Sequence, residues 1–177
     1  MKITTKTGDK GFSGLYNGKR LKKSDKLFSL LGDIDELSSF LGWTKSEIVF
    51  LKKGDFEFFE GLLLKIQDDL YKIMSFVGFE FKYPKTISSL NEDDTKFLEN
   101  TLSDFMDKIR EIKEFVRPGK GKISSMFHFA RAICRRAERS FVSICKKDKG
   151  LIELIYLNRL SDLLFVFAIF FEEKQSI

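Results

Sequence analysis

The sequence predicts an all-α protein, a bundle of about five helices in one domain that spans residues 1–177. Apolar residues recur at three- and four-residue intervals along several long segments, which is the period of a helix with one buried face. Proline is scarce, with two residues, and phenylalanine is abundant, with 20, which favours long helices packed through aromatic rings. We find no convincing alternation of apolar and polar residues of the kind that predicts a β-strand.

The first helix is predicted over residues 24–45, because Ser24-Asp25 is a helix-start signal and apolar residues follow at helical spacing. A second helix is predicted over about 55–78. Residues 79–89 contain Pro84 and are interpreted as a connector.

The third helix is predicted to begin at Asn91-Glu92 and to carry its apolar stripe as far as Ile109. Residues 117–121 read RPGKG and break the helical pattern. The fourth helix is predicted over about 123–147. Gly150 then separates it from a fifth helix that ends near residue 174.

The composition is typical of a soluble globular protein, with 43% hydrophobic and 32% charged residues. No apolar run reaches the length of a membrane span, and the first residues lack the apolar core of a signal peptide. A cytoplasmic protein is therefore expected, although a removed organelle presequence would leave no trace. The net charge of +5 is a weak indication of an anionic partner.

Cysteine and histidine are too few for a structural zinc site, since Cys134, Cys145 and His128 are the only such residues. The two cysteines lie in apolar surroundings and are interpreted as buried free thiols. His128 is interpreted as a packing residue or one that supports a neighbouring site.

Residues 3–14 read ITTKTGDKGFSG, which combines hydroxyl side chains with three glycines and two lysines. Glycine allows a close backbone approach, and hydroxyl, N–H and ammonium groups all donate hydrogen bonds, so this composition suits a polyphosphate. The spacing fits neither the Walker nor the Rossmann glycine pattern. The alternative interpretation is a solvated N-terminal arm.

The predicted fourth helix has an arginine-rich flank beside its apolar stripe, formed by Arg131, Arg135 and Arg139 around Glu138. Guanidinium groups are natural partners of phosphate, although a surface ladder of ion pairs is the alternative. Arg136 points elsewhere and is predicted to be structural. The carboxylates of the first helix, near Asp35, are candidates to pair with these arginines in the same or a neighbouring subunit.

The fifth helix has a polar interruption within its apolar sequence. Asn158 and Asp162 share a face, and Ser161 lies near them. Asparagine is a poor helix former, so Asn158 is predicted to make a specific hydrogen bond.

Four segments carry a resemblance to a known family: TKTGDKG at 5–11, GxxDEL at 32–37, RRAER at 135–139 and LNRLSD at 157–162. In this order and at these intervals they resemble the PduO-type ATP:cob(I)alamin adenosyltransferases, and the match covers nearly the whole chain. The resemblance implies an all-α five-helix bundle with ferritin-like up-and-down packing that assembles as a trimer. It also implies transfer of the 5′-deoxyadenosyl group of ATP to the cobalt of cob(I)alamin, with release of triphosphate.

The resemblance divides the chain into an N-terminal ATP-binding loop, residues 1–23, and a helical bundle, residues 24–177. The residues that it assigns to ATP binding are Thr5, Lys6, Thr7, Gly8, Ser13, Gly14, Lys23, Arg135, Arg136, Ala137, Glu138, Arg139 and Asn158. It assigns Asp35 and Arg131 to a salt bridge between subunits. The catalytic residues that it implies are Arg135 and Phe115.

Phe115 matches the family's phenylalanine that displaces the lower axial ligand of cobalt. The sequence departs from the common pattern at Arg117 and Lys120, where many relatives have an aliphatic residue before the proline. The departure affects the expected corrinoid contacts but not the ATP site.

Mg²⁺ is expected on the ATP phosphates, held mainly by the nucleotide, with no metal ligand assigned to the protein. The implied protein partners are a corrinoid reductase and an adenosylcobalamin-dependent enzyme, with no nucleic acid and no membrane. One alternative is a noncatalytic ATP- or corrinoid-binding bundle that delivers cofactor to a partner enzyme. The other is a basic helical module for nucleic acid, which would need one broad basic stripe.

Overall fold

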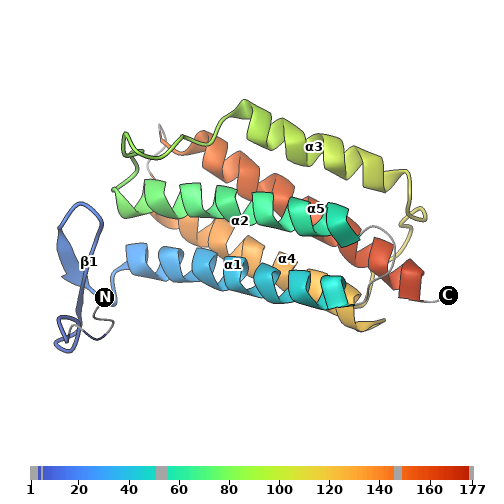
Figure 1. Cartoon of the computed structure of the whole chain (residues 1–177), viewed down its shortest axis with the longest axis horizontal. Helices are drawn as coiled ribbons and strands as arrows, with labels where there is room; N and C mark the ends of the chain where they lie inside the picture. The colour runs from blue at the N-terminus through green and yellow to red at the C-terminus, as the bar shows by residue number, and fades with distance from the viewer. Residues whose placement is uncertain (1–3, 5, 51–55, 146–148, 176–177) are drawn as a thin grey trace.

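The computed structural model describes residues 4, 6–50, 56–145 and 149–175. A small hairpin of two strands, β1 (Phe12–Gly14) and β2 (Arg20–Lys22), precedes the helices. The helices are α1 (Lys26–Phe50), α2 (Phe56–Gly78), α3 (Glu92–Met106), α4 (Lys122–Ile144) and α5 (Leu151–Gln175). Successive helices run in alternate directions along one long axis (Figure 1). The predicted five-helix bundle is confirmed.

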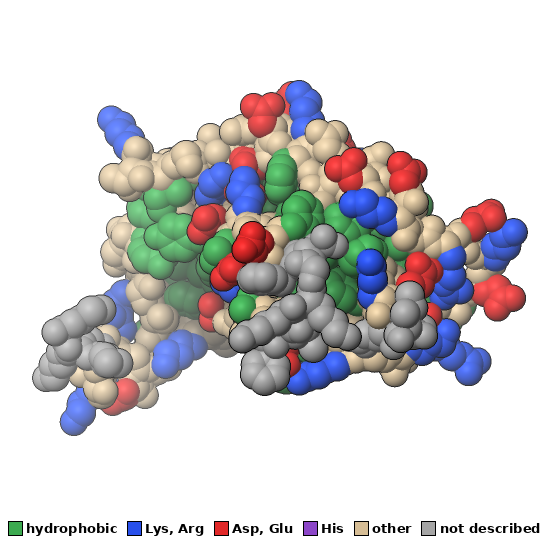
Figure 2. Space-filling model, turned by 45° about the vertical axis from the view of Figure 1, so that its right-hand side comes forward, with side chains coloured by type: hydrophobic (Ala, Val, Ile, Leu, Met, Phe, Trp, Pro, Cys, Tyr) green, Lys and Arg blue, Asp and Glu red, His purple; other side chains and the backbone are tan. Residues whose placement is uncertain are grey.

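The close helix neighbours are α2 with α1, α1 with α4, α4 with α5, and α5 with α3. Phenylalanine rings fill the space where helices stand further apart. Phe59 of α2 lies 5.6 Å from Phe105 of α3 and 5.2 Å from Phe167 of α5, measured between ring centroids. Figure 2 shows apolar side chains gathered over the middle of one face, with charged side chains around them.

Two helix starts agree with their sequence signals. The side chain of Asp25 accepts a hydrogen bond from the backbone N–H of Leu27 at 2.9 Å, ahead of α1. Asn91 caps α3, and its backbone N–H donates in return to Asp94, which completes a capping box. A cap of this kind satisfies N–H groups that have no partner within the helix.

The prediction differs from the structure at several element ends. α1 continues to Phe50 rather than ending near residue 45, whereas α3 ends at Met106 and leaves Ile109 in the following loop. α4 ends at Ile144, and part of its predicted last turn lies outside the described residues. The prediction that no strand occurs was wrong for the hairpin. Its strands have three residues each, which is too short to show an alternating pattern.

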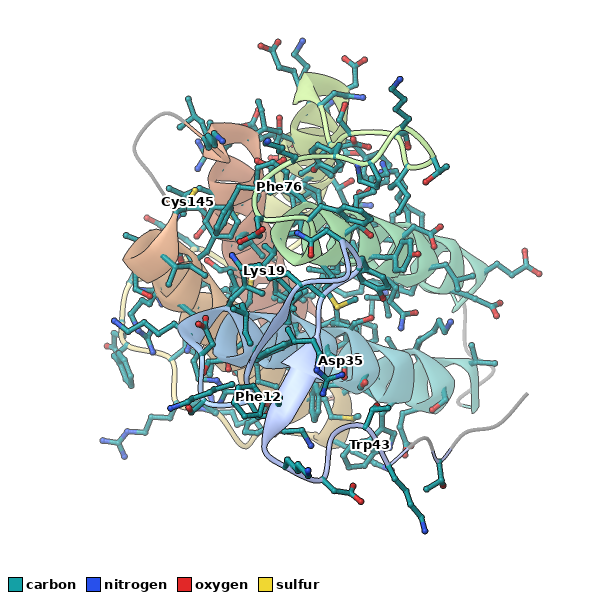
Figure 3. All side chains as sticks on the ribbon, turned by 90° about the vertical axis from the view of Figure 1, so that its left-hand side faces the viewer. Phe12, Lys19, Asp35, Trp43, Phe76 and Cys145 are labelled. Carbon is teal, nitrogen blue, oxygen red and sulfur yellow. The ribbon has the colours of Figure 1, made fainter. Side chains whose placement is uncertain are left out.

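The hairpin is attached to the bundle at its turn. Leu15 is buried, and the ring of Tyr16 stacks on that of Phe79 with 5.8 Å between centroids. Lys19 and Asn17 both donate to the carboxylate of Glu80, which follows α2. Figure 3 looks onto this end of the molecule, where the hairpin lies in front of the helices. The sequence did not indicate these contacts.

α5 is long and apolar enough, over residues 151–174, to cross a membrane by length and composition, contrary to the expectation that no run reaches this length. Within its most apolar window, 67% of the helix is buried inside the protein. It packs against both α3 and α4. Its place at the centre of the bundle accounts for its composition.

A buried polar cluster joins α2, α3 and α5. The side chain of Asp69 is fully buried and accepts hydrogen bonds from Lys65 at 2.5 Å, Lys72 at 2.8 Å and Tyr156 at 3.0 Å. Both lysines also pair with Asp94 at the start of α3. Because each buried carboxylate has cationic partners, the cluster offsets the cost of removing these charges from water.

Candidate functional site

The N-terminal segment folds as consecutive turns ahead of β1. Lys6 has a φ of +57°, in the left-handed region, and the guanidinium of Arg20 donates to the carbonyl of Thr7 at 2.6 Å. The ammonium of Lys23 lies 3.1 Å from the position that a Cβ on Gly8 would occupy. Any side chain at position 8 would therefore crowd this lysine. Of the predicted loop residues, the structure brings Gly8 and Lys23 together.

The other predicted residues of this segment are placed as follows. Ser13 pairs with Leu21 and Gly14 with Arg20 in the hairpin, directly after the turns. The side chains of Lys6 and Thr7 are exposed. Thr5 lies outside the described residues.

The arginines of α4 have different surroundings although they are close in sequence. Arg136 donates to Asp33 at 2.9 Å and also pairs with Glu36, both on α1 of the same chain. Asp33 accepts a further hydrogen bond from Ser140 at 2.6 Å. The prediction that Arg136 points away from the other arginines and has a structural role agrees with these contacts.

Arg135 and Arg139 are exposed and form no ion pair or hydrogen bond with any described residue. Arg135 and Arg131 line a hollow of ≈ 220 Å³ together with Ser161, Asp162 and Phe165 of α5. The guanidinium of Arg131 lies 5.8 Å from the ring centroid of Phe165, and its Nε is buried without a partner in the part of the chain that the structure describes. Guanidinium groups with unused donors provide a binding site for an anion.

Glu138 and Asn158 face each other across α4 and α5. The side-chain amide of Asn158 donates to Glu138 at 3.1 Å, and its carbonyl oxygen accepts from Arg159 at 3.1 Å. The specific hydrogen bond predicted for Asn158 is therefore present. The expectation that the arginines surround Glu138 is not met, since its hydrogen bond comes from Asn158. Ala137 is fully buried, so its methyl group packs in the core.

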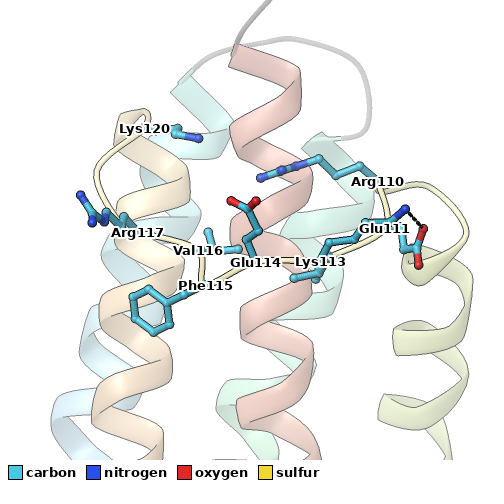
Figure 4. A pocket seen from close by; sticks show the side chains of 9 residues that line it. Arg110, Glu111, Lys113, Glu114, Phe115, Val116, Arg117 and Lys120 are labelled. Atoms are coloured by element: carbon cyan, nitrogen blue, oxygen red, sulfur yellow. Dashed lines mark ion pairs between the residues drawn. The ribbon is translucent and has the colours of Figure 1, made fainter.

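Phe115 lies in the loop between α3 and α4, and 89% of its surface is exposed. This loop surrounds an open hollow of ≈ 760 Å³. In Figure 4 the side chains of Phe115 and Arg117 point away from α5. An aromatic ring that is this exposed adds little to the core of the single chain.

The comparison with known proteins gives the family. Residues 3–171 match the family model described as cobalamin adenosyltransferase. The chain belongs to the cobalamin adenosyltransferase family. This confirms the resemblance on which the site residues were assigned.

Members of this family resemble the chain over nearly its full length. It is 38% identical over 172 residues to the corrinoid adenosyltransferase of Bacillus subtilis (strain 168), covering 95% of this chain and 85% of that protein. It is 38% identical over 178 residues to a corrinoid adenosyltransferase of Homo sapiens, covering 94% and 67%. A phenylalanine-to-alanine variant of the PduO-type ATP:corrinoid adenosyltransferase from Lactobacillus reuteri, complexed with cobalamin and ATP, has a TM-score of 0.85 at 28% identity and covers 99% of this chain and 96% of that one.

The residues assigned from the cobalamin adenosyltransferase family do not form one site within a single chain. The N-terminal hairpin lies at one end of the bundle, and the loop that carries Phe115 joins α3 to α4 at the other end (Figure 1). Asp35 is exposed on α1 and makes no ion pair with Arg131, which lies against Phe165. The arginine-lined hollow on α4 and α5 is separate from both.

His128 is buried, and neither ring nitrogen has a hydrogen-bond partner among the described residues. Burial and the nearby charge of Arg131 lower the pKa of His128, against an opposing effect of Glu172. The ring is therefore neutral at physiological pH. Its place inside the bundle agrees with the interpretation as a packing residue.

The described residues contain no group of three or more His, Cys, Asp or Glu side chains that could hold a metal ion. Cys134 is a free thiol, and the thiol of Cys145 donates a hydrogen bond to the carbonyl of Lys149 at 2.7 Å. Cys134 is buried, which raises its pKa, whereas Cys145 is only half-buried, contrary to the expectation for both.

Sequence reasoning missed Phe165 and Glu172. Phe165 follows Asp162 by one helical turn, so its position on the polar side of α5 could have been read from the spacing. Glu172 contacts Arg110 and Lys120, which are more than 50 residues away in sequence, and no local pattern indicates such contacts.

Proposed function

We propose that the protein transfers the 5′-deoxyadenosyl group of ATP to the cobalt of cob(I)alamin, giving adenosylcobalamin and triphosphate. Membership of the cobalamin adenosyltransferase family supports this activity. The observation in the structure that supports it most directly is the guanidinium of Arg135, which lines the hollow on α4 and α5 together with Arg131 and forms no ion pair with a described residue. The structures of two variants of the PduO-type ATP:corrinoid adenosyltransferase from Lactobacillus reuteri are complexes with cobalamin and ATP.

The reaction requires positioning more than acid–base chemistry. Cob(I)alamin is a strong nucleophile, and its cobalt electron pair attacks C5′ of ATP directly. The cobalt pair becomes the Co–C bond, the C5′–O bond breaks, and triphosphate leaves with the electron pair of that C5′–O bond. Guanidiniums such as Arg135, fixed on a rigid helix, bind the triphosphate and offset its growing negative charge. Mg²⁺ on the phosphates supplies further positive charge.

The N-terminal segment supplies the second group of phosphate contacts in this proposal. Gly8 allows close approach of the backbone, and the ammonium of Lys23 lies beside it. Thr5, Lys6 and Thr7 are assigned to the same loop, with Ser13 and Gly14 following it. On α4 and α5 the proposed contacts are Arg135–Arg139 and Asn158, where Arg136, Ala137 and Glu138 act by holding the helices in place.

We propose that the active sites form between subunits of a homotrimer. The hairpin and the Phe115 loop lie at opposite ends of one chain, so one chain does not bring both to one active site. Asp35 is exposed and has no ion pair with Arg131 of its own chain, which leaves both residues able to pair with a neighbour. A site shared between copies accounts for both observations.

Phe115 is proposed to occupy the space of the lower axial ligand of cobalt. Cobalt(II) that keeps this ligand is hard to reduce, whereas the four-coordinate form is accessible to a flavoprotein or similar reductant. The ring is exposed and therefore free to meet a corrinoid. A corrinoid reductase and an adenosylcobalamin-dependent enzyme are the proposed protein partners, in the cytoplasm.

The deciding experiment mixes the protein with ATP, Mg²⁺ and chemically reduced cobalamin and follows the visible spectrum. Formation of adenosylcobalamin, together with release of triphosphate, is the expected result. A protein that binds ATP and corrinoid but gives no adenosylcobalamin would instead be a noncatalytic delivery protein. An electrophoretic shift of nucleic acid without ATP binding would support the basic-module alternative.

A further inference from the structure

The loop between α3 and α4 is fastened at both of its ends by one carboxylate. Oε1 of Glu172, on α5, accepts a hydrogen bond from Nη2 of Arg110 at 3.1 Å and from Nζ of Lys120 at 3.0 Å. In Figure 4 the side chains of Arg110 and Lys120 point toward α5 from its two sides, from opposite ends of the loop. The two positions are close in space because they share this partner.

The carboxylate of Glu172 is well suited to this contact. Its side chain is 6% exposed, whereas the side chains of Arg110 and Lys120 are 51% and 67% exposed. A buried carboxylate with two cationic donors is strongly held, because loss of either donor leaves the charge poorly compensated. The neighbouring Glu173 also accepts from the backbone N–H of Arg110 at 3.1 Å.

The segment between the two fastened ends, residues 111–119, has few other attachments. The ion pair that its residues form within the described part of the chain joins Lys113 to Glu111 at 3.0 Å, so both partners belong to the segment itself. It contains no helix or strand. Phe115, near its middle, is 89% exposed. The location of this ring is therefore set mainly by where the two ends are held.

We propose that Glu172 is a positioning residue for the corrinoid reaction: it clamps Arg110 and Lys120 together and so holds Phe115 where the lower face of the corrinoid docks. This inference rests on the proposed function for the role of Phe115, but the clamp itself does not. It also assigns a structural role to Lys120, which departs from the common family pattern: its ammonium holds one end of the loop at Glu172. Displacement of a positioning group by about 1 Å is enough to cost a hundredfold in rate.

The test uses Glu172→Gln, which removes the negative charge and keeps the shape of the side chain. The matched control is Glu153→Gln, which neutralises a similarly buried carboxylate at the other end of α5. Glu153 accepts a hydrogen bond from Tyr83 at 2.7 Å and has no contact with the Phe115 loop. Any loss that both variants share is a general effect of removing a buried charge from α5.

Three measurements separate positioning from general damage. With ATP present, the four-coordinate fraction of cob(II)alamin should fall about fivefold or more in Glu172→Gln and remain near wild type in Glu153→Gln. The rate with preformed cob(I)alamin should fall less than the rate from cob(II)alamin. The affinity for ATP should stay within about twofold of wild type, because the clamp does not contact the proposed phosphate site.

A protease test examines the clamp without any corrinoid. Release of the loop should make tryptic cleavage after Lys113 about fivefold faster in Glu172→Gln than in wild type, and Lys120→Ala should have an effect in the same direction. Equal cleavage rates in Glu172→Gln and wild type would overturn the clamp. Faster cleavage with an unchanged four-coordinate fraction would overturn its link to Phe115. Absence of adenosyltransferase activity in the wild-type protein would refute the proposed function. The cleavage rates would still decide whether Glu172 clamps the loop, because that test uses no corrinoid.

Discussion

Arg135 and Arg136 are adjacent on α4, and the structure predicts opposite consequences for their loss. Arg136 is paired with Asp33 and Glu36, whereas Arg135 is exposed and has no ion pair with a described residue. Arg135→Ala should therefore damage ATP binding and turnover while the bundle stays intact. Arg136→Ala should damage the bundle first. Each variant serves as the control for the other.

The expected magnitudes follow from these contacts. A lost charge-assisted contact to triphosphate is worth about 1.5–3 kcal/mol, which weakens ATP binding roughly ten- to a hundredfold. Arg135→Ala gives up no ion pair and places a better helix former on α4, so its melting temperature should match wild type or exceed it slightly. Arg136→Ala loses two partly exposed ion pairs, worth about 0.2–1 kcal/mol each, and its melting temperature should fall by a few degrees.

Calorimetric titration with Mg·ATP measures the affinity, and thermal unfolding followed by circular dichroism measures the stability. Arg135→Lys adds a useful intermediate, since it keeps the charge but loses the planar fork that binds two phosphate oxygens. Unchanged ATP affinity in Arg135→Ala would refute the assignment. So would a loss of affinity in Arg136→Ala as large as in Arg135→Ala with no change in melting temperature.

Three further results are expected. Light scattering should give a trimer that Arg131→Ala or Asp35→Ala weakens; a fully active monomer at assay concentration would rule out a site between subunits. Phe115→Ala should leave ATP affinity and melting temperature nearly unchanged, because the ring is exposed. It should lower the rate from cob(II)alamin more than the rate from preformed cob(I)alamin. Equal losses of the two rates would assign the ring a packing role in the pocket. Burial opposes ionisation of Asp94, but its hydrogen bond from Lys65 and the other nearby donors lower its pKa below 3.8. Asp94→Asn should therefore destabilise the protein at pH 7, and the difference in stability between the variant and wild type should shrink as the pH falls through that lowered pKa. A difference in stability that is independent of pH between 7 and 2 would contradict this linkage.

The helices were predictable because their evidence is local. Apolar spacing, the start signal at Asp25, the cap at Asn91 and the break at 117–121 all act within a few residues. The strands of the hairpin were missed because three residues are too few to show an alternating pattern, and their anchor on Glu80 is a tertiary contact. Ile109 continues the helical spacing of α3 but lies beyond its end at Met106, so periodicity alone placed the boundary too late.

The residues proposed for the site stand out in the sequence, whereas their arrangement does not follow from it. The polar positions of α5 interrupt an apolar sequence, and the arginines of α4 gather on a flank beside its apolar stripe. Which arginine is paired could be decided only from the structure, because the partners of Arg136 are about 100 residues away on α1. The buried cluster around Asp69 was not predicted, since its lysines are indistinguishable in sequence from solvated ones.

The place of α5 at the centre of the bundle has a consequence for synthesis of the chain. A ribosome makes α5 after the other four helices of the bundle, so α3 and α4 are complete while the helix that covers their apolar faces is still absent. The nascent protein must hold these faces exposed until residue 151 and those after it emerge, which is a state that favours aggregation. A premature stop codon between α4 and α5 should thus yield an insoluble product rather than a smaller bundle.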